Sequence, residues 1–511
     1  RAWSILGSSI PILPSRPLLK PIFRRNLSLN SPTNDSTRPG DSESSSRFLV
    51  QPGGDLQGCL RVPGDKSISH RAIMLGALAD GETEVTGFLE GADALATLAA
   101  FRAMGVEIQG PEQGRVQIKG VGIHGLRAPD GPLDMGNSGT SMRLLSGLLS
   151  GQAFETTLIG DRSLSRRPMR RVTEPLARMG ARIETTEAGT APLRIAPNTA
   201  LSGIDYALPV ASAQVKSCLL LAGLYADGET CVTEPAVTRD HTERMLLSLG
   251  YSVERSPGRV CLHGGGRLTA APIAVPADIS SAAFFLVGAS IAPGSDLLLE
   301  AVGINPTRIG VLNILQAMGA DIRLENPRDL GAEPVADLRV RSAPLKGLQI
   351  PEDQVPLAID EFPALFIAAA CAEGETLLTG AEELRVKESD RIGVMADGLA
   401  ALGVEVEARP DGIRIQGRGG RTAGAADGSA KTAVFAPGRI DSHGDHRIAM
   451  SFAMAALRAA GPIEITDCAN VGTSFPDFAA LAAGVGLGII ETDGTANAQD
   501  GVPVDGRGGN A

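Results

Sequence analysis

Apolar helical stretches that end on glycine recur along the chain, and a segment with alternating apolar residues follows each of them. These junctions are centred on Gly105, Gly180, Gly250, Gly319, Gly403 and, in a weaker copy, Gly486. Glycine adopts the left-handed conformation that ends many helices, and alternation is typical of a half-buried strand. The pattern predicts six copies of a unit with helices and strands, which together would build an α/β fold.

A second pattern is offset from the first. The segments "ADGETEVTG" (79–87), "ADGETCVTE" (226–234) and "AEGETLLTG" (372–380) each follow an apolar helical stretch. Each segment has a Gly at a tight turn and then β-branched residues, which predicts a helix, a turn and a strand. The two patterns together indicate that one structural unit is repeated throughout the chain.

A third similarity suggests where the chain passes between domains. The segment "VPGDKSISHRAIMLGALA" from residue 62 resembles "VPADISSAAFFLVGASIA" from residue 275, and each is predicted as a strand, a Pro-containing turn and a helix begun by Ser. A chain of 511 residues exceeds the roughly 250 to 300 at which single cores stop growing. We expect one domain from 48–65 plus 278–491 and a second from 66–277. Two consecutive domains divided near residue 275 are the alternative.

The two ends of the chain differ from the rest in composition. Residues 1–47 are rich in Ser, Pro and Arg, and their first acid is Asp35, which predicts a disordered leader. An Arg- and Ser-rich, acid-poor leader resembles an organelle transit peptide. Because Arg1 stands in place of Met, an artefactual extension is equally open. Residues 492–511 are predicted to be a disordered tail.

The formal net charge of -11 argues against nucleic acid or an anionic membrane as the main partner, because phosphate backbones require a broad basic face. No apolar run reaches the roughly 18 residues of a membrane span. Six cysteines without a CxxC pair predict buried, reduced thiols and no metal site. We expect a cytoplasmic monomer that binds small anions, or a plastid protein if the leader is a genuine transit peptide.

Positive side chains stand where apolar helices are predicted to begin: Lys66, Arg71, Arg143, Lys387, Arg391 and Arg447. A cation at this end of a helix is unfavourable unless it is paired with a carboxylate or a bound anion. Free backbone N–H groups at helix N-termini also attract anions. Ordinary capping would explain the polar neighbours Ser67, Asn137 and Ser212.

The segment "DRSLSRRPMRRVTEPLAR" (161–178) has even more positive charge. For Arg170, Arg171 and Arg178 a solvated face is as good an interpretation as a functional one. Arg167 is the stronger candidate, because Pro168 holds it in an extended approach to the next helix.

Carboxylates stand in the same cationic setting. Asp360 and Glu361 precede a helix with Pro363 in its first turn, and Glu388 follows Lys387. They could be ordinary acids at helix starts, or they could transfer protons to and from a bound ligand. The residues by themselves indicate a two-domain enzyme or binding protein for small, multiply anionic ligands, which uses neither metal nor nucleotide.

Seven motifs resemble, in order, those of the 5-enolpyruvylshikimate-3-phosphate synthase (3-phosphoshikimate 1-carboxyvinyltransferase) family: "DKSISHR", "GNSGTSMR", "SRRPM", "ASAQVKS", "IDEFP", "RVKESDR" and "DHRIAMSF". The resemblance implies two inside-out α/β barrels, each of three βαβαββ units, joined by a paired hinge. It also implies transfer of the enolpyruvyl group of phosphoenolpyruvate to the 5-hydroxyl of shikimate 3-phosphate, with release of phosphate and without a cofactor.

The resemblance assigns residues to each substrate. For shikimate 3-phosphate it implies Lys66, Ser67, Arg71, Ser212, Ala213, Gln214, Arg239, Asp360 and Lys387. For phosphoenolpyruvate it implies Lys66, Gly139, Arg167, Gln214, Arg391 and Arg447, supported by Asn137, Arg143 and His446. Asp360 matches the proton acceptor of the family and Glu388 is our candidate for the acid, while Lys387 could serve in either step. As an acid at neutral pH, Glu388 would need a raised pKa.

Two motifs depart from the commoner family pattern. Ser474 stands before "FPD" where many members have Lys, and "EELRVKE" places Glu383 and Leu384 where many have Asn and Trp. Both changes resemble the second class of the family, which is known for tolerance of the inhibitor glyphosate. Several tolerant members have Ala where this chain has Gly139, so sensitivity stays open.

Three other functions are considered. The sister enolpyruvyl transferase acts on UDP-N-acetylglucosamine and typically uses a Lys-Asn motif and a loop Cys, neither of which is found in the corresponding motifs here. An RNA-end-processing relative is disfavoured by the acidic charge and by an aromatic content of 3%. A non-catalytic scaffold that binds anions is the third.

Overall fold

The computed structural model describes residues 46–419 and 433–492. The predicted leader and tail therefore lie outside the described residues except at their inner ends. Strand β1 (Arg47–Val50) pairs antiparallel with β23 (Ile489–Thr492), and Arg47 is opposite Thr492. Arg47, from the predicted leader, and Thr492, from the predicted tail, thus belong to a pair of antiparallel strands.

The first group of elements lies between residues 66 and 274. Its helices are α1 (Lys66–Leu78), α2 (Ala92–Ala103), α3 (Gly139–Leu149), α4 (Arg170–Arg178), α5 (Ala213–Gly223) and α6 (His241–Ser248), with the 3-10 helix η1 (Leu164–Arg166). Its strands are β3 (Asp80–Thr86), β4 (Glu107–Glu112), β5 (Arg115–Val121), β6 (Leu133–Asp134), β7 (Thr156–Ile159), β8 (Ile183–Glu184), β9 (Leu193–Ile195), β10 (Asp205–Ala207), β11 (Glu229–Thr233), β12 (Glu254–Ser256), β13 (Arg259–His263) and β14 (Ile273–Ala274). The sheet orders are β14-β3-β5-β4, β6-β7-β9-β8 and β10-β11-β13-β12.

The second group combines the first two strands with everything after residue 278. Its helices are α7 (Ile279–Ile291), α8 (Gly310–Ala317), α9 (Val355–Ala358), α10 (Phe362–Cys371), α11 (Arg391–Ala401), α12 (His446–Ala455) and α13 (Phe478–Gly484), with the 3-10 helices η2 (Glu352–Gln354), η3 (Glu382–Val386), η4 (Ala456–Arg458) and η5 (Ala469–Thr473). Its strands are β1, β2 (Gln57–Leu60), β15 (Asp296–Gly303), β16 (Asp321–Leu330), β17 (Glu333–Arg341), β18 (Glu373–Leu378), β19 (Glu405–Arg409), β20 (Gly412–Arg418), β21 (Gly438–Asp441), β22 (Ile463–Thr466) and β23. The sheet orders are β21-β22-β1-β23, β16-β17-β15-β2 and β18-β20-β19.

The repeat predicted from the sequence is confirmed in the backbone. The six glycines at the predicted junctions, Gly105, Gly180, Gly250, Gly319, Gly403 and Gly486, all have φ between +80° and +117°. The second pattern corresponds to β3, β11 and β18, each of which follows an apolar helix directly. The predicted α/β class is therefore correct, and six sheets form within the described residues.

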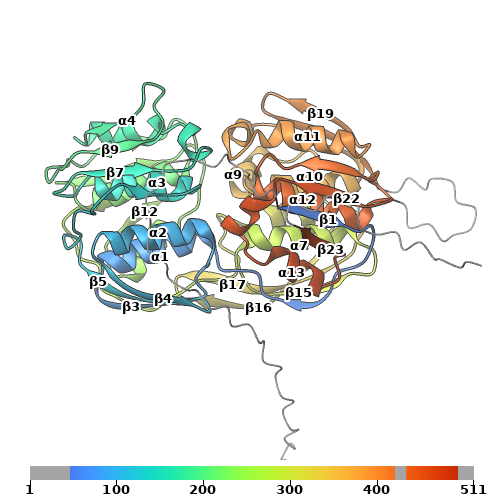
Figure 1. Ribbon diagram of the computed structural model, residues 1–511, viewed down its shortest axis with the longest axis horizontal. Coiled ribbons are helices and arrows are strands. Elements are labelled where there is room, and N and C mark those ends of the chain that lie inside the picture. The colour runs from blue at the N-terminus through green and yellow to red at the C-terminus, as the bar shows by residue number, and fades with distance from the viewer. Residues whose placement is uncertain (1–45, 420–432, 493–511) are drawn as a thin grey trace, which may run out of the picture. The chain divides into compact units, whose positions relative to one another are not determined.

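Two separate hydrophobic cores correspond to the two groups of elements. One core contains buried residues from Ile68 to Val275, and the other contains Phe48–Val62 together with Ala277–Ile489. Helices α7 and α10 are buried along their whole length because they are apolar on every face. In Figure 1 the blue strand β1 lies among the orange and red elements of the second group.

The two similar segments at residues 62 and 275 lie side by side. Gly64 and Ala277 form an antiparallel bridge, the N–H of Asp65 donates to the carbonyl of Pro276 at 2.8 Å, and the N–H of Asp278 donates to that of Pro63 at 2.9 Å. Helices α1 and α7 follow directly. We had expected each helix to begin with Ser, but the N-caps are Asp65 and Asp278. Their carboxylates accept hydrogen bonds from the first free N–H groups of the helices.

The prediction for the cysteines was wrong in two respects. Cys231 and Cys261 form a disulfide between β11 and β13, where the two residues are directly opposite each other. Cys59 is exposed, while Cys218, Cys371 and Cys468 are the buried free thiols that we expected. No helix in the described part of the chain is long and apolar enough to span a membrane.

Candidate active site

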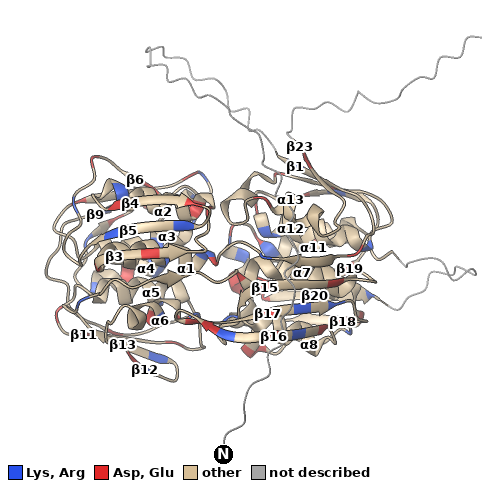
Figure 2. Cartoon of the chain, turned by 90° about the horizontal axis from the view of Figure 1, so that it is seen from below, with Lys and Arg blue, Asp and Glu red and all other residues tan. Residues whose placement is uncertain are grey.

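The first turns of helices from both groups, and the segments that precede them, line one cavity. Their side chains enclose about 80 Å³, and the predicted residues among them are Lys66, Gly139, Arg143, Arg167, Gln214, Asp360, Lys387, Glu388, Arg391, His446 and Arg447. The lining carries six Lys and Arg side chains against four carboxylates, so the charged groups favour an anion. Figure 2 shows Lys, Arg, Asp and Glu positions where the two groups face each other, and also on the outer strands.

A larger cavity of about 600 Å³ shares four lining residues with the smaller one, namely Gln214, Glu383, Val386 and Lys387. Ser212, Ala213 and Arg239, all predicted to contact the shikimate ester, also line it. The two cavities therefore collect most of the predicted residues. Ser67, Arg71 and Asn137 line neither of them.

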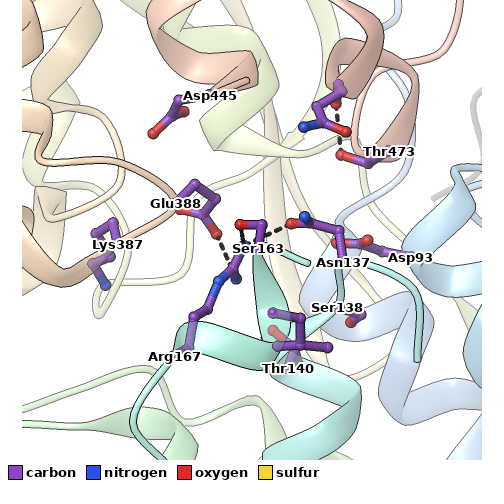
Figure 3. Close-up of polar contacts among 12 residues, drawn as sticks. Asp93, Asn137, Ser138, Thr140, Ser163, Arg167, Lys387, Glu388, Asp445 and Thr473 are labelled. Atoms are coloured by element: carbon purple, nitrogen blue, oxygen red, sulfur yellow. Dashed lines mark hydrogen bonds and ion pairs between the residues drawn. The ribbon is translucent and has the colours of Figure 1, made fainter. Parts of the chain in front are cut away.

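Arg167 joins the two groups of elements, as Figure 3 shows. One guanidinium nitrogen is 3.2 Å from Oε1 of Glu388, and the other donates to Oδ1 of Asn137 at 2.6 Å. Arg167 is only 8% exposed. The prediction that its charge serves a site, rather than a solvated surface, fits this burial.

Asp360 lies among cations from both groups. Arg239 forms a very short ion pair with it, Arg391 Nη1 is 3.3 Å from Oδ1, and Lys387 Nζ is 3.8 Å from the same oxygen. Arg447 donates to its backbone carbonyl at 3.0 Å. Burial by itself would raise the pKa of Asp360, but the charges of Arg239 and Lys387, with smaller contributions from the other arginines, outweigh it and hold that pKa well below its ordinary value. The carboxylate is therefore ionised at neutral pH.

Glu388 shares Arg391 with a buried partner. Arg391 Nη2 donates to Glu388 Oε2 at 2.6 Å, and its Nε is 2.8 Å from Oδ2 of Asp445, the N-cap of α12. Burial would raise the pKa of Glu388, yet Arg391 and Arg167 hold it well below its ordinary value. The raised pKa that an acid role needs is thus not a property of these protein contacts.

Lys66 and His446 complete the wall of the smaller cavity. Lys66 Nζ is 3.0 Å from Oδ2 of Asp93 in the first turn of α2. His446 is buried, and its Nε2 has no hydrogen-bond partner in the structure. Burial, together with the charges of Lys66 and Arg447, lowers the pKa of His446 well below its ordinary value. The imidazole is therefore neutral, so it adds no charge.

Arg71 and Ser67 line neither cavity. Arg71 is buried, and its guanidinium donates to Thr242 Oγ1 at 2.7 Å, to Ser217 Oγ at 2.7 Å and to the carbonyl of Ser67 at 2.9 Å. The guanidinium thus connects α1 to α5 and α6. Its partners Ser217 and Thr242 line neither cavity.

The start of α3 is held by a short network around Gly139. Arg143 Nη1 donates to Gln214 Oε1 at 2.5 Å, and Gln214 Nε2 donates to Thr140 Oγ1 at 3.1 Å. A Cβ on Gly139 would lie 3.1 Å from Nη1 of Arg167. Any side chain at this position would therefore press on the guanidinium.

Some residues of the site were not predicted. Asp93 and Asp445 pair with Lys66 and Arg391, Thr140 accepts from Gln214, and Glu383 lines both cavities. Asp93 and Asp445 resemble ordinary acids at helix starts, so their position in the sequence does not identify them. Glu383 was noted only as a departure from the family pattern.

One group within the described ranges is spaced to hold a metal ion, namely Glu229, Cys231 and Cys261. Its two sulfurs are bonded to each other, so neither is a thiolate ligand. The group lies on β11 and β13, and none of its residues lines the cationic cavity, whose charged side chains were predicted to act without metal.

The sequence model of EPSP synthase (3-phosphoshikimate 1-carboxyvinyltransferase) matches residues 50–481. A protein of that second name from Alkalilimnicola ehrlichii is 69% identical over 452 residues, which cover 88% of this chain and 98% of the relative. The chain belongs to the EPSP synthase family. A relative of the same name from Methylococcus capsulatus is 68% identical over 442 residues, covering 86% of this chain and 98% of its own.

Solved structures agree with the family assignment. The EPSP synthase structure from Acinetobacter baumannii is 59% identical, with a TM-score of 0.78 over 88% of this chain and all of that chain. The enolpyruvyl transferase NikO from Streptomyces tendae is 17% identical, with a TM-score of 0.68 over 88% of this chain and 99% of that one, a likeness of fold alone. The resemblance read from the seven motifs is confirmed at the level of the family.

Proposed function

We propose that the cationic cavity binds phosphoenolpyruvate and shikimate 3-phosphate side by side, and that the residues around it carry out the family reaction. The chain is an enzyme, a 3-phosphoshikimate 1-carboxyvinyltransferase of the shikimate pathway to chorismate and aromatic amino acids. It transfers the enolpyruvyl group of phosphoenolpyruvate to the 5-hydroxyl of shikimate 3-phosphate and releases phosphate. The observation that carries our assignment of the site is the excess of Lys and Arg side chains over carboxylates in a cavity lined from two cores.

The smaller cavity is the proposed phosphoenolpyruvate site. Arg167, Arg391 and Arg447 would hold its carboxylate and phosphate, since guanidinium groups bind both in a bidentate manner. Gly139 leaves room beside Arg167, and Lys66 and Gln214 would contact both ligands. Asn137, Arg143 and His446 have supporting roles, because they orient or surround these groups.

The larger cavity is the proposed site of shikimate 3-phosphate. Ser212 and Ala213, with the free N–H groups at the start of α5, and Arg239 would receive its phosphate. Lys387 would bridge the two ligands because it lines both cavities. Ser67 and Arg71, expected at the same ligand, line neither cavity and would act mainly through the position of α1.

The addition half of the reaction requires two proton transfers. The 5-hydroxyl loses a proton as its oxygen bonds to the central carbon of phosphoenolpyruvate, and the methylene carbon gains one. In the second half the carbon–phosphate oxygen bond breaks and the methyl group returns a proton. Asp360, ionised beside Lys387, is the proposed base for the hydroxyl.

Glu388 is the proposed acid, and ligand binding would supply the pKa that it needs. Its ion pair with Arg167 competes with a ligand anion for the same guanidinium. A phosphoenolpyruvate anion that takes over Arg167 removes one positive charge from Glu388 and places negative charge beside it, and both changes raise the pKa of a carboxyl group. Lys387 remains the alternative donor.

The two proposed domains close over the two ligands. One consists of residues 48–65 plus 278–491, and the other of residues 66–277. The two cores, the six sheets and the paired crossing at Asp65 and Asp278 support two inside-out barrels of three βαβαββ units each. We also propose membership of the glyphosate-tolerant second class, supported by Glu383 and Ser474. A cytoplasmic monomer without nucleic-acid or membrane partners stays a prediction.

Phosphate release separates this function from its alternatives. The purified chain is given phosphoenolpyruvate with either shikimate 3-phosphate or UDP-N-acetylglucosamine, and we expect release only with the shikimate ester. Asp360→Asn, which keeps the shape but not the charge, should lower kcat by about 100-fold or more. No release with the shikimate ester would contradict the function, and an unchanged kcat in the variant would contradict only the role of Asp360.

A further inference from the structure

An ion pair that the proposed mechanism does not use joins the two groups of elements at the edge of the larger cavity. Arg171 Nη1 donates to Glu383 Oε1 at 2.9 Å, and Arg171 Nη2 donates to Glu383 Oε2 at 3.3 Å. Both contacts therefore form a two-pronged bond, the geometry that fixes a guanidinium and a carboxylate in one orientation. The residues are 212 positions apart in the chain.

The pair connects elements of different cores. Arg171 is the second residue of α4, which packs against α5, and Glu383 lies in η3, where Leu384 is fully buried in the other core. Leu384 packs in the core and so anchors η3, while Glu383 lines the cavity. The bond consequently sets the distance between α4 and η3.

Glu383 has a second contact, which leads to the proposed chemistry. Its Oε1 is 3.8 Å from Nζ of Lys387, one helical turn further on, and the same Nζ is 3.8 Å from Oδ1 of Asp360. The ammonium thus lies between two carboxylates, only one of which has a proposed catalytic role. Removal of Glu383 would leave Asp360 as the only carboxylate that an ion-pair contact joins to Lys387 within the described residues.

The charges of the pair persist at neutral pH. Burial would raise the pKa of Glu383, but the charges of Lys387 and Arg171 outweigh it and lower that pKa below its ordinary value. The side chains of Arg171 and Glu383 are 24% and 34% exposed, so water and salt reach the bond. A partly exposed pair contributes little to folding stability, which leaves geometry as its main effect.

We propose that Glu383 and Arg171 form a strap that positions Lys387 for catalysis. In this role Arg171 holds Glu383, and Glu383 holds the ammonium of Lys387 at the boundary of the two ligand cavities. Neither strap residue needs to touch a substrate, so both are positioning residues. The inference rests on the proposed role of Lys387 in ligand bridging or proton transfer.

A double-mutant cycle tests whether the two residues act as one unit. The variants are Arg171→Gln, Glu383→Gln and their combination, assayed by phosphate release with both substrates varied. Glu383→Gln should lower kcat by about tenfold with KM values changed less than threefold, because a misplaced catalytic group affects the transition state most. Arg171→Gln should lower kcat by about threefold, since Glu383 keeps its contact with Lys387.

The combination decides the question. If Arg171 acts only through Glu383, the double variant will equal Glu383→Gln and show no further loss. Arg171→Lys, which can make one of the two bonds, should lie between the wild type and Arg171→Gln. Raising the salt concentration should lower wild-type kcat toward that of Arg171→Gln, because the pair is screened.

Arg170→Glu is the matched control. Arg170 is the exposed neighbour in the same helix and donates to the carbonyl of Glu187 in its own group of elements, so its reversal should leave kcat unchanged. Multiplicative losses in the double variant, or wild-type kcat in Glu383→Gln, would overturn the strap. Failure of the wild type to release phosphate would instead overturn the proposed function, so the two failures are distinct.

Discussion

At the scale of single residues, two of the cations predicted at helix starts, Lys66 and Arg391, have carboxylate partners, as does Arg239 just before α6. Arg391 pairs with Asp445, Arg239 with Asp360, and Lys66 with Asp93. A cation at the positive end of a helix is unfavourable by itself, and each of these carboxylates compensates it. A cation at a helix start in a sequence therefore predicts either a bound anion or a carboxylate partner from elsewhere in the chain. Only the excess of cations over carboxylates around the cavity favours the anion.

His70 shows what burial among these cations does to a titrating group. It is fully buried in α1, and its Nδ1 lies 2.8 Å from Oγ1 of Thr97. Burial, together with the charges of Lys66 and Arg71, lowers the pKa of His70 to about 3. An unfolded chain binds this proton near pH 6.5, so the unfolded state gains protons first as the pH falls. The native state consequently loses stability between pH 6.5 and 3.

We predict that His70→Gln removes part of this pH dependence. From pH 7.5 to 5.5 the wild type should lose about 1.4 kcal/mol more of its free energy of unfolding than the variant does, a difference set by one imidazole. Urea unfolding at both pH values measures it. His124→Gln, at an exposed position, is the control and should keep the wild-type dependence. Equal slopes for the wild type and His70→Gln would contradict the prediction.

At the scale of elements, the sequence predicts most of the fold. The left-handed glycines and the polar helix starts are local signals, and local signals identify local structure, which is why Gly105 and Lys66 were placed correctly. Contacts between distant segments are different. Nothing near Glu383 in the sequence indicates Arg171, and the acid of a helix start such as Asp93 has the same local pattern whether or not it meets Lys66.

The cysteines are a second example of this limit. Spacing excludes a CxxC motif but says nothing about the pairing of β11 with β13, which α6 and β12 separate in the chain, so the partners Cys231 and Cys261 were missed. A crosslink of two residues 30 apart constrains the unfolded chain, and the chain-entropy estimate for such a loop is about 3 to 4 kcal/mol.

We therefore expect Cys231→Ala with Cys261→Ala to lower the free energy of unfolding by about 3 kcal/mol. Under non-reducing, denaturing conditions, thiol titration should detect the four free cysteines of the wild type. A reductant should lower the urea midpoint of the wild type and leave the double variant unchanged. Cys59→Ser, which removes an exposed free thiol, is the control. A wild type that titrates six thiols would refute the crosslink.

At the scale of the whole described chain, one buried arginine joins the two segments, near residues 65 and 278, where the chain passes between the two groups of elements. Arg308 is 3% exposed, its Nη1 is 2.8 Å from Oδ2 of Asp65, and its Nη2 is 3.1 Å from Oδ1 of Asp278. Glu361, which precedes α10, lies 4.0 Å from the same Nη2. Three helix starts from two cores thus share one positive charge. Since Asp65 precedes Lys66 and Glu361 follows Asp360, this charge also fixes the backbone beside two proposed active-site residues.

We predict that Arg308→Met, which keeps much of the volume but not the charge, lowers the free energy of unfolding by about 3 to 5 kcal/mol at pH 8, because it leaves buried carboxylates without a counter-charge. Burial and Asp65 already raise the pKa of Asp278 to about 6 against the pull of Arg308, and loss of Arg308 would raise the pKa of Asp278 further and raise that of Asp65 as well. The native state of the variant would therefore bind more protons and recover stability as the pH falls. Urea unfolding should therefore show a smaller deficit at pH 5 than at pH 8.

The control for this variant is Arg339→Met, which removes a partly exposed partner of Asp296 at 2.8 Å and should cost less than about 1 kcal/mol at either pH. The comparison isolates burial, since both variants delete one guanidinium from an ion pair. If Arg308→Met is no more destabilising than Arg339→Met, the carboxylates at the crossings do not depend on Arg308. If its deficit grows toward pH 5, they are not the groups that take up the proton. The predicted result would make the junction of the two cores, and not only the cavity between them, dependent on paired buried charge.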